Sequence, residues 1–102
     1  MSQILEFLPE AAAEAEEAAR YYEQQVPGLG ARFRVEIEVT CAAIVRQPLL
    51  WRKRPGGFSR VNLPGFPFYI AYFIRGESIL IAAIGHASRY PDYWKSRGFG
   101  MK

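Results

Sequence analysis

Two apolar segments near the end of the sequence constrain the fold more than any other feature. They are FPFYIAYFI (66–74) and SILIAAIGH (78–86), and only Arg75, Gly76 and Glu77 separate them. Aromatic and branched residues favour strands, and so short a connection favours an antiparallel hairpin with Gly76 at positive φ. Because nearly every position is apolar, we expect both faces of these strands to be at least partly buried, one under helices and the other against a partner or as an open apolar floor.

Two helices are predicted before these strands. Alanine-rich sequence follows Pro9 and ends at PGLG (27–30), and its apolar positions recur at helical spacing: Ala12, Ala15, Ala19, Tyr22 and Val26. The opposite, solvated face is expected to carry Glu10, Glu14 and Glu17. A second helix is expected from Leu29 to Gln47, where Pro48 stops it, with a core face of Leu29, Phe33, Ile37, Cys41 and Ile44.

Further strands are expected at QILEFL (3–8) and FSRVNL (58–63). The order is then strand, two helices and three strands, and the last three should form an antiparallel meander. The sequence therefore predicts one α+β domain over residues 1–102, a two-layer β-α-α-β-β-β fold with a helix hairpin on one face of a small, mainly antiparallel sheet.

Charge is unevenly spread along the chain. The net charge is +3, but residues 1–50 carry −4 and residues 51–102 carry +7. A basic second half favours an anionic partner, either nucleic acid or an acidic protein segment, over an ordinary solvated surface.

Several classes of site are not expected. One cysteine, Cys41, allows no disulfide within the chain, which favours a reducing cytoplasm, and we expect this thiol to be buried and structural. With one histidine, the chain cannot build the usual zinc site, so no metal or cofactor is expected. The N-terminus does not read as a signal peptide, and the longest apolar run is too short to span a membrane.

The segments EAAAEAEEAARYYEQQVPGLGARF, FPFYIAYF and IAAIGHASRYPDYW together resemble the RelE/ParE superfamily of bacterial toxins. The resemblance runs from about Phe7 to Trp94, and the order of elements agrees with the family fold. YYE with PGLG and RF resembles the ParE-like, or plasmid stabilisation, branch. The resemblance implies the cytoplasmic toxin of a type II toxin–antitoxin module, in a hetero-oligomer with an acidic or amphipathic antitoxin segment that folds on binding.

The resemblance is compatible with three different activities. ParE-like members block DNA gyrase, which is the inferred target here. RelE-like members cleave messenger RNA at the ribosome, which would make the chain a metal-independent endonuclease. A non-toxic member that only binds its antitoxin is the third alternative.

A nuclease needs a base, an acid and cations around one phosphate. A histidine suits either proton-transfer role at neutral pH. The catalytic candidates, if the chain is a nuclease, are His86, Arg60, Arg89 and Tyr90. The alternative is that His86 holds a loop and that the arginines pair with antitoxin carboxylates.

Target- or antitoxin-binding candidates come from the basic half: Arg52, Lys53, Arg54, Arg75, Tyr93 and Trp94. Trp51 beside the cations of the loop WRKRPGG (51–57) suits single-stranded nucleic acid, although the loop could simply be solvated. Tyr93 and Trp94 either stack on a partner or cap the core and pin the C-terminal segment.

Overall fold

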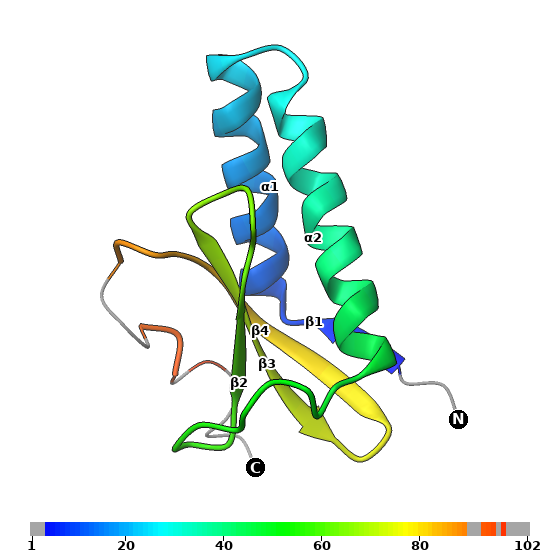
Figure 1. Cartoon of the computed structure of the whole chain (residues 1–102). Helices are drawn as coiled ribbons and strands as arrows, with labels where there is room; N and C mark the ends of the chain where they lie inside the picture. Colours follow the sequence, from blue (N-terminus) through cyan, green and yellow to red (C-terminus); the bar gives the residue numbers. More distant parts are fainter. Residues whose placement is uncertain (1–3, 90–92, 96, 98–102) are drawn as a thin grey trace.

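The structure, a computed structural model, describes residues 4–89, 93–95 and 97. Its elements are β1 (Ile4–Phe7), α1 (Pro9–Gln25), α2 (Leu29–Arg46), β2 (Ser59–Asn62), β3 (Phe68–Arg75) and β4 (Ser78–His86). The two helices form a hairpin that stands on one face of the sheet (Figure 1). This confirms the predicted α+β, two-layer arrangement, and α2 ends one residue earlier than expected.

The sheet has the strand order β1-β4-β3-β2. Strands β2, β3 and β4 form the predicted antiparallel meander, and Gly76 in the β3–β4 turn has φ 59°. β1 lies at the edge and runs parallel to β4, with Ile4 opposite Ser78. A register shift at Ala71 and Tyr72 shows that the β3–β4 ladder contains a bulge.

The helix hairpin is fixed by its connection. The Glu23 carboxylate accepts hydrogen bonds from the backbone N–H groups of Gly28 and Gly30, at 2.8 and 2.9 Å, at the start of α2. Gly28 has φ 90°, a backbone conformation that favours glycine. A Cβ on Gly30 would lie 2.5 Å from the Ala19 carbonyl oxygen. The helices therefore approach closely here, which explains the PGLG sequence.

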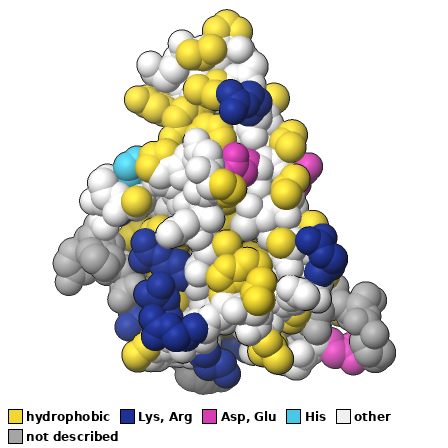
Figure 2. Space-filling view, in the orientation of Figure 1, with side chains coloured by type: hydrophobic (Ala, Val, Ile, Leu, Met, Phe, Trp, Pro, Cys, Tyr) yellow, Lys and Arg dark blue, Asp and Glu magenta, His cyan; other side chains and the backbone are white. Residues whose placement is uncertain are grey.

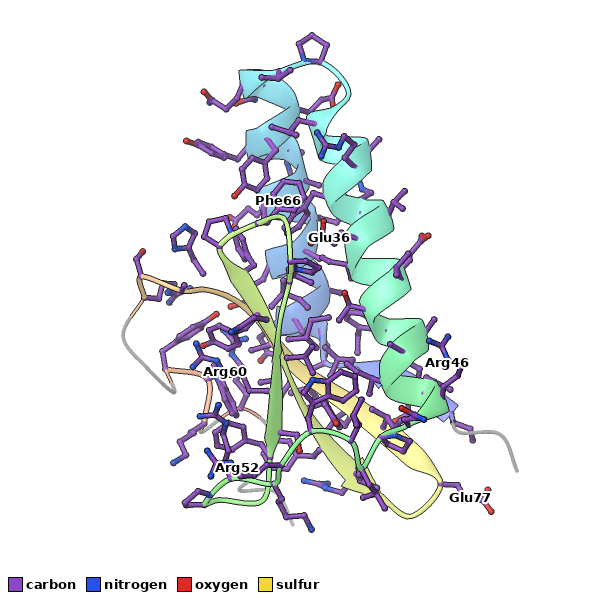
Figure 3. All side chains as sticks on the ribbon, viewed as in Figure 1. Glu36, Arg46, Arg52, Arg60, Phe66 and Glu77 are labelled. Carbon is purple, nitrogen blue, oxygen red and sulfur yellow. The ribbon has the colours of Figure 1, made fainter. Side chains whose placement is uncertain are left out.

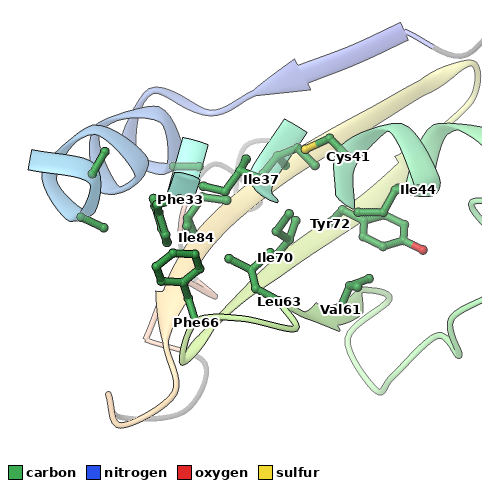
Figure 4. Close-up of a cluster of buried hydrophobic side chains, with 14 of the residues drawn as sticks. Phe33, Ile37, Cys41, Ile44, Val61, Leu63, Phe66, Ile70, Tyr72 and Ile84 are labelled. Carbon is green, nitrogen blue, oxygen red and sulfur yellow. The ribbon is translucent and has the colours of Figure 1, made fainter. Parts of the chain in front are cut away.

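The main core lies between the hairpin and the sheet (Figure 4). Phe33, Ile37, Cys41 and Ile44 of α2 are buried, as predicted. They belong to one cluster with side chains of the strands: Val61, Ile70, Tyr72, Ile79, Ile81 and Ile84. Burying each of these large apolar side chains stabilises the folded state by about 1.5–3 kcal/mol relative to leaving it exposed.

The face of the sheet opposite the helices carries a second cluster. It comprises Phe58, Tyr69, Ala71, Ala82, Ala83 and Trp94. Trp94 is fully buried, and its Nε1–H donates to the Tyr69 hydroxyl at 3.1 Å. An open apolar floor was one expectation for this face. The chain's own tryptophan covers it instead, so Trp94 caps the core.

The predicted face of α1 is partly wrong. Ala12 and Val26 are exposed, and the buried residues are Ala11, Ala18 and Ala19. Glu14, expected on the solvated face, is mostly buried. The helix is rotated from the prediction because it also contacts a segment beyond β4. Within the described residues, neither helix combines the length and apolarity that a membrane crossing requires.

Candidate functional site

A cavity of about 350 Å³ lies where α1, β4 and the segment after β4 meet. Its lining includes His86 and Arg89, so the structure brings together two of the proposed catalytic residues. Tyr93 and Glu14 also line it. Tyr90 lies outside the described residues.

His86 ends β4, and its surroundings hold it in one orientation. The ring packs edge-to-face on Phe68, with 5.0 Å between centroids. Nδ1 accepts the Ser88 backbone N–H at 3.0 Å and lies 2.8 Å from the Ser88 hydroxyl oxygen. This geometry supports the interpretation in which His86 fixes the turn after β4.

Glu14 is the centre of the polar network in this cavity. Its carboxylate accepts bonds from the Ile84 backbone N–H at 3.0 Å and the Tyr93 hydroxyl at 2.5 Å. Arg97 donates two further bonds, at 3.0 and 2.8 Å, and Arg89 lies 3.8 Å away. One acid of α1 therefore ties β4 to the C-terminal segment.

The same network sets the protonation of its members. The hydrogen bond with Glu14 raises the pKa of Arg97, which stays a cation. Burial, followed by the bond to Glu14, raises the pKa of the Tyr93 phenol well above its usual range. Tyr93 is therefore a neutral donor, and the guanidinium of Arg89 lies 3.6 Å from its ring centroid.

Sequence reasoning did not single out Glu14 or Arg97. A usable signal was present, because Ala11, Glu14 and Ala18 recur at helical spacing on one stripe of α1. Arg97 offered none, since its partner lies 83 residues away in the sequence.

Arg60 is not part of the cavity. Its guanidinium lies 3.9 Å from the ring centroid of Tyr69. Tyr69 belongs to the cluster opposite the helices, whereas Phe68, which contacts His86, packs against the helix-side cluster. Successive strand residues face opposite sides of a sheet, so Arg60 and His86 are separated by it. Of the catalytic candidates, Arg60 therefore does not lie in one site with His86 and Arg89.

The loop 51–57 presents cations on a fixed backbone. Arg52 and Lys53 are exposed and Arg54 is half-buried. The Ser59 hydroxyl donates to the Trp51 carbonyl at 3.2 Å, and the backbone N–H of Arg54 donates to the backbone carbonyl of Phe58 at 2.7 Å. Trp51 is half-buried and packs against the helix-side core, so it is not a stacking platform.

These cations share one side of the molecule. Figure 2 shows Lys and Arg side chains in a column there, and Figure 3 places Arg52 and Arg60 along it. Lys95 lies beside the loop, since a Cβ on Gly56 would be 3.5 Å from its Cε. We call this surface the basic face, made up of Arg52, Lys53, Arg54, Arg60 and Lys95.

The other binding candidates differ in their relation to the loop. Arg75 is exposed at the end of β3, 5.8 Å from the Phe73 ring centroid, and a Cβ on Gly57 of the loop would lie 4.0 Å from the same ring. Trp94 is buried, and Tyr93 is half-buried in the Glu14 network. Their role in the structure is to hold the C-terminal segment on the domain.

Apolar grooves run along α2 instead. One of about 430 Å³ lies between β1 and α2, lined by side chains that include Leu5, Phe7, Ala42 and Val45. Another, of about 500 Å³, lies beside the exposed Val35 and Val39 and reaches Pro64. The groove beside β1 adjoins the open edge of the sheet.

Metal and thiol chemistry find no support in the part of the chain that the structure describes. No group of three or more His, Cys, Asp or Glu side chains there could hold a metal ion. Burial raises the pKa of the Cys41 thiol to about 11, so it is a protonated core residue at neutral pH.

Comparisons with known proteins point to one family. The model of the family described as "ParE toxin of type II toxin-antitoxin system, parDE" matches residues 5–91. The chain is similar to a structure titled "Chromosomal ParDE TA system from P. aeruginosa", with a TM-score of 0.74 and 19% identity over 83% of this chain and 96% of that one. No curated protein sequence matches significantly.

The chain is also similar to a mutant of the E. coli toxin RelE in the free state. The TM-score is 0.52, and the identity is 13% over 86% of each chain. At such identities the two structures show a shared fold.

Proposed function

We propose that this chain, which belongs to the ParE toxin family of type II toxin–antitoxin systems, inhibits DNA gyrase by binding it as a protein rather than by cutting RNA. Membership in the family makes it the toxin half of a pair with a cognate antitoxin.

The observation that carries the proposal is the separation of the nuclease candidates. RNA cleavage needs a base, an acid and a cation around one phosphate. Arg60 lies on Tyr69 on the far face of the sheet from His86. In the cavity, Nδ1 of His86 accepts a hydrogen bond from the Ser88 backbone N–H, and Arg97 forms an ion pair with Glu14. An inhibitor that acts by contact needs no such assembly.

The experiment pairs two assays on the same purified protein. We expect it to inhibit supercoiling of relaxed plasmid by gyrase and to leave a defined mRNA intact in a cell-free translation reaction with mapped 3′ ends. His86→Ala should retain gyrase inhibition. Ribosome-dependent, codon-phased cuts that His86→Ala abolishes would make the chain a nuclease. If both assays are negative and the protein still binds its antitoxin, it is a harmless binder.

The cognate antitoxin fits the groove between β1 and α2 better than the sheet face predicted from the sequence, which Trp94 covers. The groove is apolar, as an amphipathic segment requires. The edge strand β1 also offers unpaired backbone groups to an extended segment.

A substitution that fills the groove tests this placement. Ala42 is exposed and lines the groove, whereas Ala13 is exposed on α1 and lines none of the grooves described above. Ala42→Arg should weaken antitoxin binding, measured by calorimetry, while Ala13→Arg leaves it near wild type. Equal affinities for the two variants would place the antitoxin elsewhere.

A further inference from the structure

We infer that the basic face, made up of Arg52, Lys53, Arg54, Arg60 and Lys95, binds the phosphate backbone of duplex DNA. This goes beyond the proposed contact with gyrase and does not depend on it. Three features support the inference: the charge of this surface, the way in which the loop backbone and Arg60 are held, and what the surface lacks.

The three cations of the loop and Arg60 have no acidic partner within the described residues. Within residues 4–89, 93–95 and 97, the ion pairs join Arg34 to Glu16 and join Arg89 and Arg97 to Glu14, and none involves Arg52, Lys53, Arg54 or Arg60. Figure 3 places the labelled acids Glu36 and Glu77 away from Arg52 and Arg60. The face therefore attracts a polyanion.

The backbone of the loop and the Arg60 side chain are also held in place before any partner arrives. The bonds from Ser59 to Trp51 and from Arg54 to Phe58 fasten the loop to β2. Arg60 is stacked at 3.9 Å on Tyr69, whose hydroxyl is in turn bonded by Trp94. A stacked guanidinium keeps its N–H donors in its own plane, where they can reach phosphate oxygens.

What the face lacks favours a duplex backbone over single-stranded nucleic acid and over an acidic amphipathic peptide. The rings behind it are buried, since Phe58, Tyr69 and Trp94 are 4%, 3% and 0% exposed. Single-stranded nucleic acid needs exposed rings on which bases stack. An acidic amphipathic peptide needs an apolar groove, and the grooves along α2 are lined by other residues. Binding of a duplex through its phosphate backbone requires only a row of cations.

Fluorescence anisotropy with a labelled duplex of random sequence tests the inference. The full-length chain should bind it, with an affinity that falls steeply between about 50 and 200 mM salt. Replacing Arg52, Lys53 and Arg54 together by alanine should weaken binding by about tenfold or more and lower the salt slope by about one per lost phosphate contact. None of the three side chains belongs to the core, so circular dichroism should show an unchanged fold.

A matched variant controls for net charge. Replacing Arg20, Arg32 and Arg46, which are exposed on the helices, removes the same three charges and should leave the affinity near wild type. Equal losses in the two triple variants, or no binding at low salt, would overturn the inference. Tighter binding of a single strand of equal length would overturn the duplex assignment. If the loop variant loses antitoxin binding but keeps DNA binding, the basic face is a protein interface.

Discussion

At the scale of single residues, Glu14 does the most to connect distant parts of the chain. Its carboxylate bonds to the backbone of β4, to Tyr93 and to Arg97, and only 14% of its side chain is exposed. We expect Glu14→Gln to lower the free energy of unfolding by about 2–3 kcal/mol, because Arg97 loses its counter-charge and the amide NH2 must face groups that donate to the carboxylate. Urea unfolding measures this.

Glu17 provides the control, since it lies one turn further along α1 and is exposed. Glu17→Gln should change the unfolding free energy by less than about 0.5 kcal/mol. If Glu14→Gln behaves in the same way, the network is too solvated to matter.

The contrast between Glu14 and the core residues shows what sequence could reveal at this scale. Ile37, Cys41 and Gly76 were placed correctly because local spacing and turn length determine their environments. Glu14 was assigned to solvent because its main partner is Arg97, a residue that no local pattern connects to α1. Arg60 and His86 could both be catalytic candidates because the pattern of a single strand does not fix which residues of two strands share a face.

At the scale of elements, the α1–α2 connection depends on a carboxylate. Hydrogen bonds from the N–H groups of Gly28 and then Gly30 lower the pKa of Glu23 below its ordinary value of 4.5. A lowered pKa in the folded state stabilises the fold above pH 4.5, and this contribution is lost as the pH falls through the lowered value. The anion also lies at the N-terminus of α2, where the helix dipole favours negative charge.

We therefore expect Glu23→Gln to reduce stability at neutral pH and to differ less from wild type as the pH falls towards about 3. Urea midpoints across that pH range measure the difference. Glu38→Gln, an exposed change on α2, should track wild type throughout. A deficit for Glu23→Gln that is the same at every pH would show that its charge is not what stabilises the connection.

At the scale of the whole molecule, one sheet carries a cluster on each face. Trp51 packs against the helix-side cluster and Trp94 belongs to the other. Strands β3 and β4 supply residues to both clusters. Both clusters therefore depend on the same two strands, and neither can stay packed if these strands separate. Each tryptophan can be observed alone: Trp51 in the Trp94→Phe variant and Trp94 in the Trp51→Phe variant. In each variant, we expect the fluorescence of the remaining tryptophan and the circular dichroism signal to change at the same urea concentration.

The opposite result is equally informative. A change in Trp94 emission at a lower urea concentration than the loss of secondary structure would show that the C-terminal segment detaches from a folded domain. The two-layer fold followed from the sequence because apolar runs and helix spacing are local. The covering of the second face did not, because it depends on where a short segment beyond β4 returns to the sheet.

The pairing of β1 with β4 also determines when the sheet can form during synthesis of the chain. Ile4 pairs with Ser78, which is made 74 residues later, about 4–15 s at ordinary rates of synthesis. During that interval β1 has no strand beside it and the helix-side core has no sheet. The complete sheet therefore cannot form until almost all of the described chain has been made.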